Sequence, residues 1–159
     1  MFCTLAMSAQ SVFDKFDGKD DVTTVVVTKK MFQMMGNVNS KESQDFIELV
    51  KKLDNLKIFT TTSVARAKEL KETANSYMKS KSLEELMRVT ENGSNVRIMV
   101  KTQGSETRVR ELLLLVEGQA KQETVVMTLT GDFDLNDVSA LTDKMNLPGG
   151  KSLKKAAKK

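Results

Sequence analysis

The sequence predicts an α+β fold: a single two-layer domain in which a mixed sheet of about five strands ends in an antiparallel meander and carries its helices mainly on one face. Two strand-like runs, at residues 22–28 and 56–61, are each followed by helix-periodic segments. Three further strand-like runs then follow one another with short connections. The 159 residues, 40% of them hydrophobic, suffice for one core and leave no room for a second domain.

The first part of the chain alternates strand and helix patterns. Its expected elements are an amphipathic turn at residues 12–16, a strand at 22–28, a short helix at 29–36, a longer helix capped by Ser40 and a strand at 56–61. The strands are rich in β-branched residues, which suit a pleated surface. Gly36 supplies a helix end, while Phe46, Leu49 and Val50 recur at the spacing of a helix.

A long helix is predicted to begin after Ser63, because an apolar stripe there faces away from a row of charged residues. The stripe consists of Ala67, Leu70, Ala74, Tyr77 and Met78. Ser82 and Glu85 have the spacing of a capping box, which predicts a further helical turn. Its inward side chains would be Leu83, Leu86 and Met87.

Three consecutive strands are predicted in the last part of the chain, at residues 96–101, 108–116 and 124–130. Their short connections make neighbouring strands antiparallel. Residues 112–116 are apolar on both faces, so this strand belongs in the middle of the sheet. A last helix is expected from Asp134 to Pro148, with an apolar side formed by Leu135, Val138, Leu141 and Met145.

Residues 1–10 are uncharged and mostly apolar and end in small residues, which is typical of the end of a secretory signal peptide. We therefore expect residues 1–10 to be removed, residues 11–148 to form the α+β domain and residues 149–159 to form a flexible tail. The expected location is the periplasm or the cell envelope. The alternative is an apolar N-terminal segment that packs on the domain.

The formal charge of +4 is concentrated in the C-terminal tail, which carries Lys151, Lys154, Lys155, Lys158 and Lys159. Without these five, 20 of the 25 basic residues remain against 21 acidic ones. The domain itself is therefore nearly neutral, which argues against nucleic acid as a partner. The tail could contact an anionic membrane or glycan, or it could serve only to keep the chain soluble.

The chain contains no histidine, and its one cysteine, Cys3, lies in the expected leader. The mature domain therefore lacks the commonest general base, the commonest transition-metal ligand and the thiol nucleophile. We predict no enzymatic activity, no catalytic residues and no cofactor. A hydrolase built on Asp132 and Asp134 remains an alternative, although carboxyl groups two residues apart on an extended segment point to opposite faces.

An acidic cluster follows the last predicted strand. Asp132, Asp134 and Asn136 fall on the first, third and fifth positions of a calcium loop, but Asp137 stands where that loop requires glycine. The same carboxylates also suit the beginning of a helix, where they accept from unpaired N–H groups. We therefore predict no metal site here and keep calcium binding as an alternative.

A second cluster, Met31, Met34 and Met35, places three thioethers on one helical face. Such an arrangement could bind copper(I), but methionine also fills cores and adaptable contact surfaces. With no histidine beside the cluster, a core or partner surface is favoured. We therefore take Met31, Phe32, Met34 and Met35, together with the five tail lysines, as the candidates for contact with a partner.

Several short segments stand out by their order along the chain. They are Val-Val-Val-Thr-Lys-Lys-Met-Phe at 25–32, Leu-Lys-Ile-Phe at 56–59, Tyr-Met at 77–78 with Leu-Met-Arg-Val at 86–89, Glu-Leu-Leu-Leu-Leu at 111–115 and Leu-Thr-Gly-Asp-Phe-Asp-Leu at 129–135. In this order and spacing they resemble the bacterial family called domain of unknown function 4252, over about residues 22 to 145. The resemblance implies a small exported single-domain protein, often described as a putative lipoprotein, to which no catalytic residues are assigned. The lipobox of the lipoprotein members is missing here.

These observations together predict an exported protein of the bacterial cell envelope that acts as a non-enzymatic binding or regulatory module. Its partner would be an envelope protein. One alternative is a carrier of a small ligand or of calcium or copper ions. The other is the carboxylate-based hydrolase.

Overall fold

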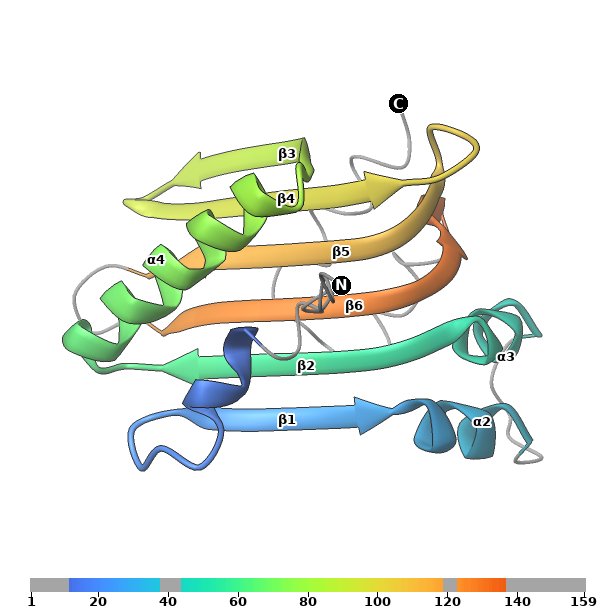
Figure 1. The fold of residues 1–159 in the computed structure, drawn as a ribbon, viewed down its shortest axis with the longest axis horizontal. Helices are drawn as coiled ribbons and strands as arrows, with labels where there is room; N and C mark the ends of the chain where they lie inside the picture. The colour runs from blue at the N-terminus through green and yellow to red at the C-terminus, as the bar shows by residue number, and fades with distance from the viewer. Residues whose placement is uncertain (1–11, 38–43, 119–122, 137–159) are drawn as a thin grey trace, which may run out of the picture.

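Six strands form one antiparallel sheet in the computed structural model, which describes residues 12–37, 44–118 and 123–136 (Figure 1). The order across the sheet is β1-β2-β6-β5-β4-β3. The strands are β1 (Thr23–Thr28), β2 (Leu53–Thr61), β3 (Glu84–Glu91), β4 (Ser94–Thr102), β5 (Arg108–Glu117) and β6 (Thr124–Asp134). The helices are the short 3-10 helix η1 (Asp14–Phe16), α2 (Lys29–Asn37), α3 (Gln44–Lys51) and α4 (Val64–Ser80). The α+β class predicted from the sequence is confirmed, with one strand more than expected.

Strand β3 stands where the sequence predicted a further helical turn. Its register with β4 shifts between Glu85 and Met87, which marks a bulge at Leu86. Because of this bulge, the consecutive side chains of Leu86 and Met87 both pack against the core on one face. Two adjacent inward residues imitate a helical pattern, which explains the wrong prediction. The hairpin from β3 to β4 turns at Asn92 and Gly93, whose φ angles of 50° and 80° suit such a tight turn.

Every neighbouring pair of strands is antiparallel, where the sequence led us to expect a mixed sheet. Helices α2 and α3 pack on each other at one end of the sheet and reverse the chain between β1 and β2 (Figure 1). Strand β2 therefore returns beside β1 in the opposite direction. Helix α4 then crosses the sheet and leads to β3 at the other edge (Figure 1). The strands from β4 to β6 form the antiparallel meander that short connections predicted, and β3 extends it by one strand.

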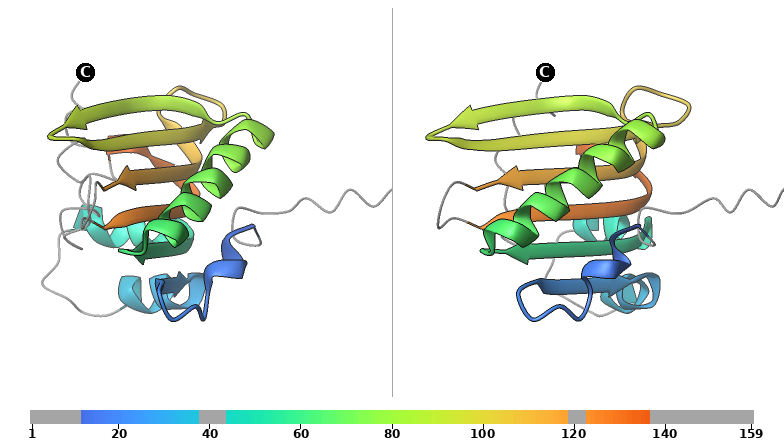
Figure 2. Two further views of the ribbon diagram at one scale, coloured as in Figure 1. Left: turned by 90° about the vertical axis from the view of Figure 1, so that its left-hand side faces the viewer. Right: turned by 60° about the vertical axis from the view of Figure 1, so that its left-hand side comes forward.

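Side chains are buried on both faces of the sheet, and the described helices are divided between them. Helix α4 and η1 contribute to the core on one face, whereas α2 and α3 contribute to the core on the other, although we expected them mainly on one face (Figure 2). The four leucines of β5, Leu112 to Leu115, are completely buried and alternate between the two cores. The central position predicted for this strand is thereby confirmed.

The N-terminal turn belongs to the domain through a cluster of aromatic rings. Phe13 stacks on Phe59 of β2 at a centroid distance of 5.7 Å and lies 6.1 Å from the ring of Tyr77 in α4. Phe16 meets the ring of Phe59 edge-on at 6.3 Å. These contacts confirm the predicted amphipathic turn and hold η1 against α4 and β2.

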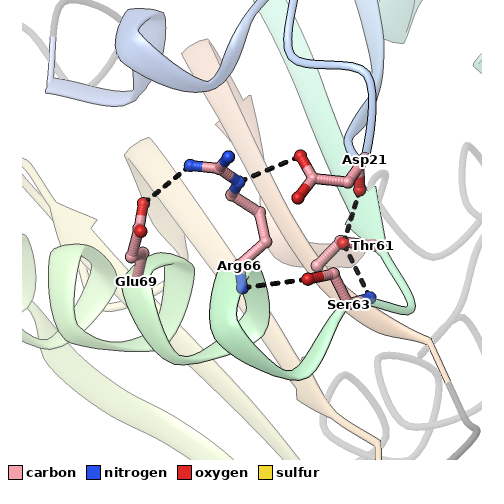
Figure 3. Close-up of polar contacts among 5 residues, drawn as sticks. All are labelled: Asp21, Thr61, Ser63, Arg66 and Glu69. Carbon is pink, nitrogen blue, oxygen red and sulfur yellow. Dashed lines mark hydrogen bonds and ion pairs between the residues drawn. The ribbon is translucent and has the colours of Figure 1, made fainter.

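Polar contacts close the end of the sheet at which β2 passes into α4 (Figure 3). The hydroxyl of Thr61 donates to the carbonyl oxygen of Asp21 at 2.6 Å and accepts from the backbone N–H of Ser63 at 3.1 Å. The side chain of Ser63 accepts from the backbone N–H of Arg66 at 3.3 Å, so the predicted helix cap is present. Arg66 donates to the carboxylates of Asp21 at 3.0 Å and Glu69 at 2.9 Å.

Several predictions fall on residues outside the described ranges. They are the leader at residues 1–10, Ser40 as a helix cap, the last predicted helix beyond Asn136 and the tail at 149–159. Within the described ranges, none of the helices combines the length and the apolar character that a membrane crossing requires.

Candidate functional site

An open hollow of about 630 Å³ lies at the end of the sheet where α3 passes into β2 and where β6 ends. We call it the basic hollow; it is lined by Lys29, Lys51, Lys52, Asp54, Ser105, Arg108, Arg110, Asp132, Phe133 and Asp134. A second hollow of about 430 Å³ adjoins it and shares Arg108, Arg110 and Asp132 while reaching Gln103 and Gly104. The concave surface therefore extends from α3 to the loop between β4 and β5.

Irregular strand pairing places the charged residues of the basic hollow. The register of β2 with β6 shifts beside Asp54, and the register of β5 with β6 shifts beside Arg110. Opposite Arg110, strand β6 has the two residues Gly131 and Asp132 between its paired positions. Bulges of this kind turn side chains away from their regular alternation, and they often occur beside functional sites.

Gly131 is required by the close approach of two backbone segments. A Cβ atom at this position would lie 2.5 Å from the carbonyl oxygen of Lys52 and 3.0 Å from the Cα atom of Leu53. The next residue, Asp132, donates its backbone N–H to the same carbonyl oxygen of Lys52 at 3.0 Å. The absence of a side chain at Gly131 thus allows β6 to hold the connection between α3 and β2.

Arg108 and Asp132 form a two-pronged ion pair across β5 and β6. The Nε atom of Arg108 lies 2.6 Å from Oδ1 of Asp132, and its Nη2 atom lies 2.5 Å from Oδ2. The hydrogen bond from Arg108 is the largest effect and lowers the pKa of Asp132; burial raises this pKa by less, and the charges of Arg108, Arg110 and Lys52 lower it further. Asp132 is therefore ionised at neutral pH.

The other two carboxylates of the basic hollow also have partners. Asp134 accepts from the backbone N–H and from the side-chain amide of Asn136, both at 2.8 Å. Burial alone would raise the pKa of Asp134, but hydrogen bonds from Asn136 and Thr107 outweigh burial and lower it. Asp54 lies 3.3 Å from the Nζ atom of Lys29.

The two described aspartates of the alternative calcium site are held by other residues of the domain. Asp132 is paired with Arg108, Asp134 holds the turn at Asn136, and Asp137 lies outside the described residues. In the part of the chain that the structure describes, no group of three or more cysteine, aspartate or glutamate residues is arranged to hold a metal ion.

The Met-rich helix α2 presents only some of its candidate contact residues to solvent. Met31 and Met34 are 51% and 57% exposed. Phe32 is completely buried, and Met35 is half-buried against the same core. Of these four residues, Met31 and Met34 are thus the ones placed for contact with a partner, whereas the five tail lysines lie outside the described residues.

The sequence reasoning missed the basic hollow, because its cations come from three separate segments of the chain. Lys29 begins α2, Lys51 ends α3 with Lys52 directly after it, and the two arginines lie at the beginning of β5. The pattern Arg108-Val109-Arg110 could have drawn attention, since alternate residues of a strand share a face. The carboxylate at Asp132 was noticed, but its partner Arg108 lies 24 residues earlier.

The chemistry of the basic hollow favours binding of an anionic group. Five of its ten lining residues are cationic and three are anionic, and two of the cations are arginines, whose planar groups match the geometry of carboxylates. Ser105 is the one hydroxyl among these residues, and its Oγ atom accepts from the backbone N–H of Arg108 at 3.2 Å. Such a set can hold and orient a negatively charged group.

The chain matches the model of one protein family, which is described as Domain of unknown function (DUF4252), over residues 16–141. The matched segment contains every strand of the sheet and every residue that lines the basic hollow. No curated protein matches the chain, and no solved structure matches it.

Proposed function

The chain belongs to the DUF4252 family of domains of unknown function, and from this premise we propose that it is a non-enzymatic binding module of the bacterial cell envelope, which captures an acidic segment of a partner protein in its basic hollow. The family itself assigns no activity. The proposal therefore depends on one observation, the gathering of five cations around an open concave surface at the bulged end of the sheet.

The shape of the site supports a peptide segment over a single small ion. The basic hollow and its neighbour share three residues and together extend across three strands. An extended acidic chain can place successive carboxylates against Lys51 and Arg110, with charge-assisted hydrogen bonds at each. The carboxylate of Asp54 can accept from the N–H groups of the same chain.

The protonation states in the basic hollow support a binding role over catalysis. A carboxyl group that acts as a general acid near neutral pH needs a raised pKa. Asp132 and Asp134 have lowered pKa values, the first through Arg108 and the second through hydrogen bonds that outweigh its burial. The chain also has no histidine that could act as a base.

The binding proposal can be tested by fluorescence anisotropy of the full chain with a labelled peptide of about six glutamates. We expect binding that weakens as salt is raised, because exposed charges are screened. Arg110→Glu should weaken binding about tenfold or more, since it replaces an attractive charge at the centre of the site with a repulsive one. The matched control is Lys19→Glu, the same charge reversal at an exposed position in the loop between η1 and β1; this loop lies at the opposite end of the sheet (Figure 1).

Equal affinity of the wild-type chain and Arg110→Glu would contradict the proposed site. An equal loss in Lys19→Glu would contradict it as well, since net charge alone would then govern binding. The proposed location needs a separate measurement, the mass of the protein recovered from fractionated cells. A periplasmic or envelope fraction in which residues 1–10 are absent supports export, and a cytosolic form that retains Met1 opposes it.

A further inference from the structure

Strand β1 forms one edge of the sheet, and its outer side has no neighbour among the described strands. Its six residues, Thr-Thr-Val-Val-Val-Thr, contain no charge and no proline. The pairing of β1 with β2 runs without a shift from Thr23 to Thr28. An edge strand that is regular, uncharged and β-branched is a ready template for pairing with another strand.

The surface beside this edge is apolar. Among the described residues, five large hydrophobic side chains are exposed, and four of them lie between residues 25 and 34. Val25 and Val26 are 43% and 44% exposed. Because successive residues of a strand point to opposite faces, an added strand would cover one valine on each face.

The opposite edge, β3, is protected against such pairing. It carries the charged residues Glu84, Glu85, Arg88 and Glu91, and its bulge interrupts the regular edge. Arg88 donates to Glu85 at 2.8 Å and lowers the pKa of that carboxyl group. Charges and bulges are the usual means by which edge strands avoid pairing. Strand β1 has neither.

The charges that flank β1 have opposite signs at its two ends. Asp20 and Asp21 precede the strand, and Lys29 and Lys30 follow it, so that residues 20–30 read Asp-Asp-Val-Thr-Thr-Val-Val-Val-Thr-Lys-Lys. Val25 is the centre of this segment. When two copies of the segment are placed antiparallel about that centre, the acidic end of each faces the basic end of the other.

We propose that β1 pairs with β1 of a second copy of this chain, antiparallel about a two-fold axis at Val25, so that two sheets join into one of twelve strands. In this register Val25 faces its own copy, Thr24 faces Val26 and Thr23 faces Val27. β-Branched pairs of this kind stabilise neighbouring strands. The outward N–H and C=O groups of both edges gain partners at the same time.

Symmetry restricts the possible registers. In an antiparallel pair, directly facing residues point to the same face of the sheet. A two-fold axis that relates two identical strands runs perpendicular to the sheet and keeps each side chain on its own face. One residue must therefore face its own copy at the axis. Centring on Val26 in place of Val25 would shift the register by two residues and move the acidic flank of each copy away from the basic flank of the other. With Val25 at the axis, the acidic loop before β1 and the basic first turn of α2 lie equally far along the chain from the centre, so that each lies beside its opposite in the other copy.

The outer charged pair provides the clearest probe of this register. Asp21 is already bound by Arg66, and Lys29 lies beside Asp54 within its own chain. Asp20 and Lys30 are both exposed. Asp20 lies in the loop before β1 and Lys30 in the first turn of α2, so in the proposed dimer the acidic end of each copy, with Asp20, lies beside the basic end of the other, with Lys30.

The test measures the mass of the full chain by analytical ultracentrifugation over about 1 to 100 μM, a range in which a specific dimer of moderate affinity dissociates. We expect a concentration-dependent dimer. Val25→Lys should raise its dissociation constant about tenfold or more, since two ammonium groups would face each other at the axis. Thr90→Lys, which places a lysine at an exposed position of β3, is the matched control and should leave the dimer unchanged.

Charge reversal then tests the register. Asp20→Lys and Lys30→Asp should each weaken the dimer about threefold to tenfold, and the double variant should restore it, because the chain ends that lie side by side again have opposite signs. Circular dichroism checks that each variant is folded. A chain that stays monomeric at the highest concentration overturns the proposal. A dimer that Val25→Lys leaves intact, or a double variant without recovery, overturns it as well.

Discussion

Two arginine–aspartate pairs lie at opposite ends of the sheet, and they differ in what surrounds them. Arg66 pairs with Asp21 at 3.0 Å where β2 passes into α4, and the arginine side chain is 24% exposed (Figure 3). Arg108 pairs with Asp132 at 2.5 Å beside the basic hollow, and its side chain is 59% exposed. The arginine is therefore better covered at one end, which we call the enclosed end, than at the other, the open end, although Asp21 and Asp132 are similarly exposed at 42% and 39%.

The difference lies in which chain segments each pair connects. Asp21, Thr61, Ser63 and Arg66 belong to the loop before β1, the end of β2 and the beginning of α4, and their hydrogen bonds tie the three segments together. Arg108 and Asp132 belong to β5 and β6, which the strand pairing already joins. The first pair thus contributes to the fold, whereas the second leaves an arginine beside a hollow, where it can meet a ligand.

The largest effect is expected from Gly131→Ala, because the open end depends on backbone packing more than on its ion pair. The added Cβ atom would lie 2.5 Å from the carbonyl oxygen of Lys52, so the backbone must move. We expect the free energy of unfolding to fall by about 2–3 kcal/mol. Urea denaturation with a two-state fit measures this loss.

Gly36→Ala is the matched control for this change. Its Cβ atom would meet Cγ of the Lys51 side chain at 2.9 Å, and this flexible chain can move aside. An alanine within α2 also gains helix propensity. We expect a change within about 1 kcal/mol of zero. Equal losses at both glycines would show that the approach of β6 to Lys52 is not what holds the open end.

The enclosed end is expected to respond to Thr61→Val, which keeps the shape of the side chain and removes its hydroxyl. Thr61 is buried, and its Oγ1 atom bonds both the carbonyl oxygen of Asp21 and the N–H of Ser63. Leaving such groups unpaired costs about 1–3 kcal/mol of stability. Thr128→Val is the control, because the buried Oγ1 of Thr128 has no hydrogen-bond partner among the described residues. Thermal unfolding should show a loss in the first variant and little change or a gain in the second.

A smaller effect is expected from Ser63→Ala at the same end. The Ser63 side chain accepts from the N–H of Arg66 at the beginning of α4. Loss of such a cap lowers stability by about 1 kcal/mol. Ser63→Asp restores an acceptor and should recover most of the loss in urea denaturation. A deficit that persists in Ser63→Asp would mean that the hydroxyl acts by another route.

Local features of the sequence predicted much of the fold. Ser63 was identified as a cap because its side chain acts within one turn. The four leucines of β5 predicted a central strand because burial on both faces leaves a continuous apolar run. Strand β3 was mistaken for a helical turn because the bulge at Leu86 breaks the alternation by which strands are recognised.

The candidate site was not predicted, since nothing local to Lys51 or Arg108 indicates that they lie around one hollow. Their proximity depends on the pairing of β6 with both β2 and β5, which is set by contacts far apart in the sequence. The aspartates were noticed but interpreted without their partners. From the sequence, Asp132 was interpreted as a metal ligand or as part of the beginning of a helix. In the structure it is the ion-pair partner of Arg108, which the sequence pattern could not reveal.

The smallest effect is expected from Asp132→Asn, which tests whether the open pair is as weakly coupled to the fold as its exposure indicates. Arg108 lowers the pKa of Asp132 in the folded state, so the ionised carboxylate stabilises the fold above the pKa of about 4 that it has when unfolded. This contribution is lost as the pH falls through the lower, folded pKa. The wild-type chain should therefore be slightly more stable than the variant at about pH 7, and the two should converge once the pH lies below the lowered pKa of the folded state.

Added salt should narrow the difference in stability between the wild-type chain and Asp132→Asn, because exposed charges are screened. Asp17→Asn, at an exposed loop position, controls for the change in net charge. A large loss in Asp132→Asn that persists at low pH would place this pair with Arg66 and Asp21 among the contacts on which the fold depends.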